Sequence, residues 1–407
     1  MPVLKDISRL AQCLNKGAQT EVHIIEEAAL VWTGSRVKWV GKERELPLDF
    51  RKEECVSARG ALVVPGLIDC HTHLCFAGWR AEEFEQRLLG RSYLDIAKAG
   101  GGILSTVAKT RLADADSLKL RCEQFLKEIY ELGVTTLECK SGYGLDLENE
   151  IKVLEVYDHL RRAGHRITST LLAAHTFPTE FAARREDYIK LVCNEIIPQV
   201  AQRKLASFCD VFLEESAFSY SEAEEILECG LRYGLRSKIH ADQLTDSGGA
   251  KLAAKLKAIS ADHLEKLNPQ HIPAMKQAGV IAVALPVASL YTKQPALQVR
   301  SLIEAGVEVA VATDFNPGSA PTFDLQLAMM LACTMCGMTP TEVLKGVSIY
   351  AAKAIGLEDQ IGSLEPGKLA DFAVIDAPDI NHWMYNFTPG RCRMTYRAGE
   401  KLFDSFA

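Results

Sequence analysis

From about residue 60 to residue 315, apolar runs alternate with amphipathic segments that have the pattern of helices. The runs are almost continuous in apolar residues, which is typical of parallel strands that are covered on both faces. Repeated strand–helix units over roughly 300 residues predict a (β/α)8 barrel or a doubly wound sheet. Seven strands are clear, and we place a weaker one, the second of the barrel, near Ile103 to Ala108. The seven clear runs span 62–70, 134–140, 167–175, 235–240, 258–263, 280–286 and 307–314.

The two ends of the chain have a different pattern. Residues 20–60 are turn-rich and contain alternating apolar and polar positions, as around Arg36 to Val40, and a similar pattern returns after residue 360. Such alternation predicts antiparallel strands. The expected fold is therefore an α/β protein: a (β/α)8 TIM barrel with a small β-sandwich domain formed from both chain ends. The expected parts are 1–61 and 360–407 for the small domain and 62–359 for the barrel.

Composition and charge narrow the classes of function. Of 407 residues, 48% are hydrophobic and 24% are charged, and the net charge is −7. This is the balance of an ordinary globular protein, and it argues against a general nucleic-acid binder, which needs clustered positive charge. The N-terminus lacks the pattern of a secretory signal, and the longest apolar stretch, Val280 to Leu290, is short of the ~18 residues that cross a membrane. We expect a cytoplasmic protein without a membrane partner.

Twelve cysteines are scattered along the chain. Without a secretory signal, reduced thiols are expected rather than a disulfide framework. One close pair, Cys333 and Cys336, lies in an apolar run, where we expect buried small hydrophobic residues. A redox or metal role for this pair is the alternative.

Histidines gather at one structural position. Of ten histidines in the chain, five lie at or just past the end of a predicted strand: His71, His73, His175, His240 and His263. In a (β/α)8 barrel, the carboxyl ends of the strands form the active-site face. The two imidazoles of His71-Thr72-His73 also point to the same face, because strand residues two apart do so. The alternative for this pair is two surface histidines on a loop.

Asp314 ends the last apolar run and is expected near the mouth of the barrel. A turn or helix-capping role is the alternative, because Asn316-Pro317-Gly318-Ser319 follows directly. Three histidines and one carboxylate suit zinc or ferrous iron. Such a metal lowers the pKa of a bound water toward ~7, and a neighbouring carboxylate can take its proton and deliver it to a leaving nitrogen. His263 can donate to the reacting carbonyl or orient the water.

Several motifs resemble those of the amidohydrolase superfamily. PGLIDCHTHL resembles its metal motif on the first strand, and GSLEPGKLADFAVID resembles its terminal segment. Within that superfamily, the chain is most similar to the imidazolonepropionase family. ECKSGYGLD, LLAAHTFP, KIHADQLT, SADHLE and TDFNPGS resemble that family's segments in order and spacing from about residue 60 to 375. The HxH motif is shared by many hydrolases, whereas SGYG together with AAHTFP and DFNPGS is specific.

The resemblance implies hydrolysis of a ring C–N bond of 4-imidazolone-5-propionate to N-formimidoyl-L-glutamate in histidine breakdown. It implies one zinc or iron per chain, with Asp314 as general base and acid and His263 assisting. The resemblance to the superfamily suggests a homodimer. The implied metal ligands are His71, His73, His240 and Asp314. The implied substrate contacts are Arg80, Tyr143 and His175. At the other end of the substrate, the implied contacts are Asn316, Gly318 and Ser319.

For some of these positions, the residue type and its place in the sequence also suggest a role. The propionate needs a cationic partner, and Arg80 follows the metal motif. Tyr143 lies between glycines, so we expect it to be exposed on a mobile loop. Gln243 stands where some relatives carry glutamate; it can bind the ring but cannot act as a base. Lys140 could be a carbamylated lysine bridging two metals, although the family pattern favours a mononuclear site.

Other functions remain open from the sequence. A mononuclear deaminase, a two-metal cyclic-amide hydrolase, a non-catalytic barrel and a redox protein using Cys333 and Cys336 are the alternatives. The Gly100-Gly101-Gly102 run lacks the lysine and hydroxyl residue of a phosphate loop. It is expected to be either a lid over the site or an ordinary flexible loop.

Overall fold

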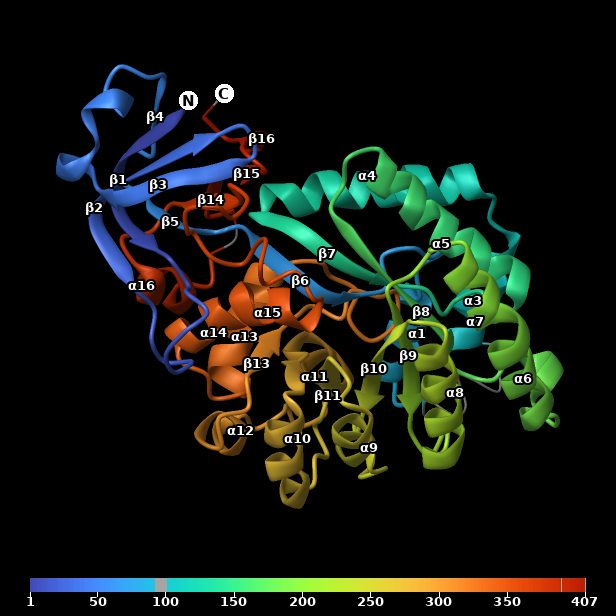
Figure 1. The fold of residues 1–407 in the computed structure, drawn as a ribbon. Coiled ribbons are helices and arrows are strands. Elements are labelled where there is room, and N and C mark those ends of the chain that lie inside the picture. The colour runs from blue at the N-terminus through green and yellow to red at the C-terminus, as the bar shows by residue number, and fades with distance from the viewer. Residues whose placement is uncertain (92–100, 389, 407) are drawn as a thin grey trace.

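A computed structural model describes residues 1–91, 101–388 and 390–406 of the chain. Its strands form two sheets, and Figure 1 shows one of them inside a ring of helices and the other beside it, near both chain termini. Gly100 lies outside the described residues, so the expected lid is described only from Gly101 onward.

The first sheet is an all-parallel barrel of eight strands in sequence order. It is nearly closed between its first and last strands by a bridge from Thr72 to Phe315 and by a hydrogen bond from the His73 N–H to the Phe315 carbonyl. This confirms the predicted (β/α)8 barrel. The strands are β6 (Leu67–Thr72), β7 (Val134–Lys140), β8 (Ile167–Ala174), β9 (Phe208–Leu213), β10 (Arg236–Ala241), β11 (Ser260–His263), β12 (Ile281–Ala284) and β13 (Val309–Val311).

One predicted strand was wrong. Residues Ile103–Leu112 form helix α3, and the strand that the prediction lacked is β9, between β8 and β10. The sequence of β9, FCDVFL, carries Asp210 in its centre, which breaks the apolar run by which the other strands were found. Asp210 is fully buried inside the barrel among charged partners. This strand therefore lacks the continuous apolar pattern of the others, because one of its central residues takes part in a buried ion pair.

The second sheet combines both ends of the chain, as predicted. Its order is β16-β15-β14-β5-β1-β2-β3, with β4 also paired to β1. The chain leaves this sheet and enters the barrel at Gly66, so β5 pairs with the small sheet although the predicted first part ends at residue 61. The division of the chain into domains stays a prediction. The strands are β1 (Val3–Ala11), β2 (Ile24–Thr33), β3 (Arg36–Lys42), β4 (Cys55–Ser57), β5 (Leu62–Pro65), β14 (Phe372–Ile375), β15 (Cys392–Arg397) and β16 (Glu400–Asp404).

Helices surround the barrel (Figure 1) and bury their apolar faces against it. No helix within the described ranges is long and apolar enough to cross a membrane. The helices are α1 (Ala81–Leu88), α3 (Ile103–Leu112), α4 (Ala115–Glu131), α5 (Leu147–Arg162), α6 (Arg185–Leu191), α7 (Ile197–Gln202), α8 (Tyr220–Arg232), α9 (Gly249–Leu256), α10 (Ile272–Ala278), α11 (Pro286–Thr292), α12 (Arg300–Glu304), α13 (Leu325–Met335), α14 (Pro340–Gly346), α15 (Ile349–Ala354) and α16 (Ile380–Tyr385).

Candidate metal and substrate site

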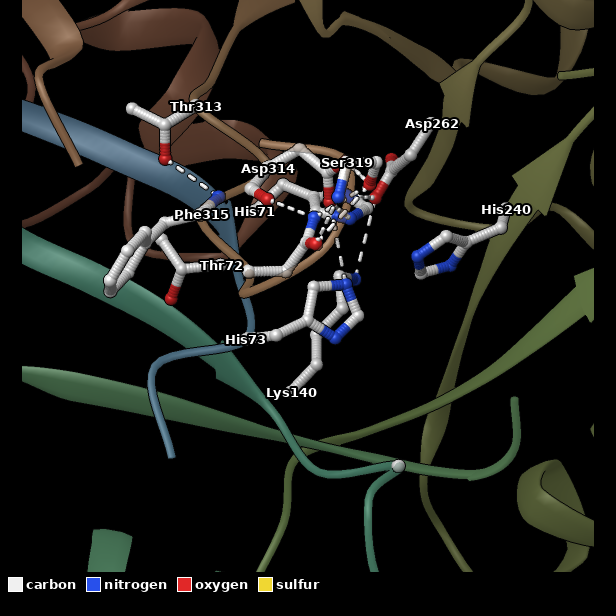
Figure 2. Close-up of polar contacts among 12 residues, drawn as sticks. His71, Thr72, His73, Lys140, His240, Asp262, Thr313, Asp314, Phe315 and Ser319 are labelled. Carbon is white, nitrogen blue, oxygen red and sulfur yellow. Dashed lines mark hydrogen bonds and ion pairs between the residues drawn. The ribbon is translucent and has the colours of Figure 1, made fainter. Parts of the chain in front are cut away.

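Four histidines and one aspartate meet at the carboxyl ends of the barrel strands. His71 lies in β6 and His240 in β10, His263 ends β11, and His73 and Asp314 follow β6 and β13. Their side chains are between 0% and 4% exposed. Figure 2 shows those of His71, His73 and Asp314 gathered together, with His240 facing them from β10, across the barrel. The structure thus brings together residues separated by more than 200 positions in the sequence.

Distances between these side chains match a shared cation. Nε2 of His71 lies 3.4 Å from Oδ1 of Asp314, and Nε2 of His73 lies 3.5 Å from the same oxygen. Ligand atoms of His71, His73 and His240 all lie within 4.8 Å of one another. The same limit holds for His71, His263 and Asp314, so His263 borders the same space.

In two imidazoles, one ring nitrogen faces a carboxylate and the other has no hydrogen-bond partner among the described residues. Nδ1 of His71 donates to Oδ2 of Asp262 at 2.6 Å, and Nδ1 of His240 faces Oδ2 of Asp210 at 2.9 Å. Nε2 of both rings is buried and has no hydrogen-bond partner among the described residues. A buried polar atom without a partner costs about 1–3 kcal/mol, and a carboxylate on the far nitrogen is the usual support of a metal-binding histidine. The donor set therefore fits a zinc or iron ion.

Backbone contacts across the barrel seam place the carboxylate of Asp314. The Asp314 N–H donates to the His71 carbonyl at 3.1 Å, and the His73 N–H donates to the Phe315 carbonyl at 2.8 Å. Asp314 and His263 both have left-handed backbone conformations, with φ of 58° and 80°. Such conformations are costly for residues other than glycine and cluster at functional sites. Closure of the barrel thus directs Asp314 toward both histidines of the HxH motif.

Burial and neighbouring charges set the protonation of these groups. Burial lowers the pKa of His240 to about 3 and also lowers that of His73. Burial alone would raise the pKa of Asp314, but the neighbouring imidazoles of His71 and His73 hold it well below its usual value. Burial and Lys140 oppose protonation of His71, yet Asp262 and Asp314 raise its pKa to about 9. Because a metal ligand must be deprotonated, a divalent cation would compete with a proton at His71.

Beneath the histidines lies a cluster of five fully buried charged side chains: Glu138, Lys140, Asp210, Lys238 and Asp262. Nζ of Lys140 lies 2.9 Å from Glu138, 2.7 Å from Asp210 and 3.4 Å from Asp262. These three carboxylates raise the pKa of Lys140 against the effect of burial and favour its ammonium form. A carbamate at this position would place a negative group among three carboxylates, so these contacts do not favour the two-metal alternative.

Arg80 and the 316–319 turn lie together beside the metal-ligand candidates. Asn316 shapes the turn: its Oδ1 accepts from the N–H groups of Gly318 and Ser319, both at 2.8 Å, and its Nδ2 donates to the Asp314 carbonyl at 2.6 Å. The Arg80 guanidinium covers Gly318 so closely that a Cβ there would lie 0.9 Å from Nη2. Arg80 is 13% exposed; its Nε has no hydrogen-bond partner in the described part of the chain and lies 3.9 Å from Oε2 of Glu83. This largely buried guanidinium can receive an anion.

The rings of Tyr143 and His175 both lie against the ring of His73. The His175 ring stacks on His73 with centroids 5.1 Å apart, and its Nδ1 contacts the Gly142 carbonyl at 3.1 Å. Tyr143 is 3% exposed, so the expected exposure of this side chain was wrong. Its loop is held by Glu150, whose Oε1 accepts from the N–H groups of Gly144 and Leu145 at 2.8 and 2.9 Å. A buried carboxylate thus replaces solvent as the partner of this loop.

Gln243 and the cysteine pair are the remaining residues that the sequence singled out. Gln243 is half-buried in the loop after β10. Burial raises the thiol pKa of Cys333 to about 11 and that of Cys336 to about 12, so neither forms a reactive thiolate at neutral pH. This disfavours the redox alternative.

The charged cluster was missed from the sequence, although it left a signal. Glu138 and Lys140 are two apart in β7, and Lys238 and His240 are two apart in β10, so each pair shares one strand face. Charged residues at alternate positions of an otherwise apolar strand point to a polar barrel interior. Asp210 could not be found in this way, because its strand was not recognised.

Comparison with known proteins agrees with this geometry. Residues 62–402 match the profile of the amidohydrolase family. An imidazolonepropionase of Shouchella clausii is 44% identical over 391 residues, which cover 94% of this chain and 86% of that protein. An imidazolonepropionase of Pseudomonas savastanoi pv. phaseolicola is 45% identical over 375 residues, covering 90% and 92% of the two chains.

Solved structures share the fold at low sequence identity. An adenosine deaminase from Xanthomonas campestris with bound zinc superimposes with a TM-score of 0.74 at 16% identity, covering 99% of this chain and 93% of that one. Escherichia coli guanine deaminase gives 0.73 at 15% identity, with both chains covered completely. The chain belongs to the amidohydrolase family and, within it, to the imidazolonepropionases.

Proposed function

We propose that this protein hydrolyses a ring C–N bond of 4-imidazolone-5-propionate and releases N-formimidoyl-L-glutamate, a step of histidine degradation. The proposal rests on one observation above all: the buried cluster of His71, His73, His240 and Asp314 occurs in a chain 44% identical to an imidazolonepropionase over 94% of its length.

The four side chains of this cluster would hold one zinc or iron ion. When bound, such an ion supplies Lewis acidity, which lowers the pKa of water and polarises a carbonyl group. Both metals accept nitrogen and oxygen ligands, so the ligand set alone does not choose between them. This assignment is supported by Nε2 of His71 and Nε2 of His240, neither of which has a hydrogen-bond partner in the part of the chain that the structure describes.

Asp314 is proposed to move the proton in the reaction. Its carboxylate accepts a proton from water while the water oxygen adds to the ring carbonyl carbon. The adjacent C–N bond then breaks, its electron pair stays on nitrogen, and Asp314 returns the proton to that nitrogen. The low pKa of Asp314 keeps the carboxylate ionised before the reaction begins. His263, beside the same space, is proposed to donate to the carbonyl oxygen or to orient the water.

Arg80 is proposed to bind the propionate group of the substrate. Its guanidinium is largely buried, and a charge-assisted pair contributes roughly 1.5–3 kcal/mol. The resemblance places the 316–319 turn at the other end of the substrate. Because the Arg80 guanidinium lies against Gly318, we instead place Gly318 and Ser319, on the turn that Asn316 holds, at the propionate end. Tyr143, His175 and Gln243 would contact the ring.

The proposal is tested by mixing purified protein of known metal content with the substrate. We expect the ring absorbance of imidazolonepropionate to disappear, and we expect hydantoin, dihydroorotate and guanine to remain unchanged. Release of ammonia from guanine would instead favour the deaminase alternative. Turnover of dihydroorotate with two metal ions per chain would favour the two-metal alternative.

A further inference from the structure

One ammonium group connects two of the metal-ligand candidates. Nζ of Lys140 lies 2.7 Å from Oδ2 of Asp210 and 3.4 Å from Oδ2 of Asp262. The same two oxygens face Nδ1 of His240 at 2.9 Å and Nδ1 of His71 at 2.6 Å. One carboxylate oxygen therefore links each imidazole to the same ammonium group. Figure 2 shows Lys140 beneath the histidines.

Strand register creates this arrangement. In the parallel pairing of β10 with its neighbours, Lys238 pairs with Asp210 on β9, and His240 pairs with Asp262 on β11. Lys140, at the end of β7, reaches both carboxylates from across the barrel interior. All three charged groups at this junction are fully buried, so solvent does not screen their interactions. A displacement of Nζ would therefore change the electrostatic interaction energy of both carboxylates.

We propose that Lys140 is a positioning residue of the metal centre. It holds Asp210 and Asp262 so that Nε2 of His240 and Nε2 of His71 point at the same ion. It also draws electron density from both carboxylates, which limits how strongly each one polarises its imidazole. Lys140 contacts neither substrate nor metal in this role. The inference rests on the metal centre of the proposed function.

Lys238 provides a matched control in the same cluster. It is equally buried, and its Nζ lies 3.1 Å from Oε2 of Glu138 and 3.3 Å from the carbonyls of Cys70 and Ala354. Among the described residues, Lys238 makes no hydrogen bond or ion pair with either carboxylate that faces a histidine, although its charge also lowers the pKa of Asp262. Substitution of Lys238 therefore removes one buried charge without removing the connection between Asp210 and Asp262.

Cobalt binding distinguishes this role from a merely structural ion pair. Metal-free wild type, Lys140→Met and Lys238→Met are titrated with Co²⁺ against a chromophoric chelator, and visible absorption reports the ligand geometry. Circular dichroism checks the fold of each variant. We expect Lys140→Met to bind Co²⁺ roughly 10–100-fold more weakly, as other losses around metal ligands do, with a shifted spectrum. Lys238→Met, which removes a charge near Asp262 but no contact to it, should keep the wild-type spectrum and lose less affinity than Lys140→Met.

Non-additivity gives a second test. If Lys140 acts through Asp210, adding Asp210→Asn to Lys140→Met should weaken Co²⁺ binding by less than Asp210→Asn does alone. Should Lys140→Met not fold, Lys140→Gln, which keeps a hydrogen-bond donor, takes its place in both measurements. Wild-type affinity and spectrum in the folded Lys140 variant would overturn this inference alone. Failure of the wild type to bind one Co²⁺ would overturn the metal centre and this inference together.

Discussion

At the scale of single residues, the side chains of the site are positioned by specific neighbours. Asp262 holds the tautomer of His71, and Asn316 holds the turn that carries Gly318. Nearly all of these groups are buried, so a lost partner is not replaced by water, and the cost of removing it is high. Substitutions that preserve shape and remove one chemical property are therefore the informative ones.

Asp314→Asn should remove the proton acceptor and keep the shape of the side chain. General acid–base catalysis contributes about 10²–10⁴-fold, so kcat should fall by at least this factor. Steady-state kinetics at saturating substrate measure the change, and elemental analysis reports how much metal remains. Asp359→Asn, on an exposed residue, is the control. A rate unaffected by Asp314→Asn would contradict the role proposed for this carboxylate.

Gly318→Ala should displace Arg80 without changing its charge. The new Cβ would lie 0.9 Å from Nη2, so the guanidinium must move away from the turn. Loss of one charge-assisted contact of about 1.5–3 kcal/mol corresponds to a rise in KM of roughly 10–100-fold. The double variant with Arg80→Met should lose no more than Arg80→Met alone, because both changes remove the same contact. Additive effects would show that the two residues act separately.

At the scale of elements, buried carboxylates replace solvent as partners of the loops around the site. Glu150, in the first turn of α5, accepts N–H groups of the 142–145 loop. Glu214, just after β9, does the same for Leu244 and Thr245, in the loop that carries Gln243. The position of these loops after strands follows from the barrel pattern, but their support by Glu150 and Glu214 does not. Tyr143 is buried rather than exposed for this reason.

Glu150→Gln should loosen the 142–145 loop while leaving the metal centre unchanged. Oε1 accepts from all three N–H groups and Oε2 only from that of Gly142, so an amide removes the charge from these bonds and turns an NH2 group toward the Gly142 N–H. Loss of about 1.5 kcal/mol corresponds to a roughly tenfold rise in KM, because Tyr143 and His175 are proposed substrate contacts. Kinetics and metal content are measured together. Glu148→Gln, an exposed change on the same helix, should match the wild type. A loss of metal would assign Glu150 a different role.

At the scale of the whole molecule, the metal-ligand candidates come from three strands or strand ends of one barrel, β6, β10 and β13. An ion bound there would join parts of the chain far apart in sequence. The unfolded chain cannot assemble this site, so binding adds directly to the free energy of unfolding.

Removal of the metal should therefore destabilise the protein. At a free zinc concentration a thousandfold above Kd, binding stabilises the folded state by about 4 kcal/mol. Denaturant unfolding of chelator-treated protein, with and without added Zn²⁺, measures the difference. The His240→Ala variant should respond much less to Zn²⁺. Equal unfolding midpoints for metal-free and zinc-treated wild type would argue against a metal centre.

Sequence by itself determined the barrel, the small sheet from both chain ends and the strand-end positions of His71, His73, His240, His263 and Asp314. These features follow from local periodicity, because the residues of a parallel strand themselves indicate that the strand is buried and where it ends. Only the tertiary structure decided which side chains support them. Asp210 and Asp262 meet Lys140 through strand register, and Arg80 covers Gly318 through packing between distant loops. Such contacts depend on how separate strands and loops come together, and no single stretch of sequence carries that information.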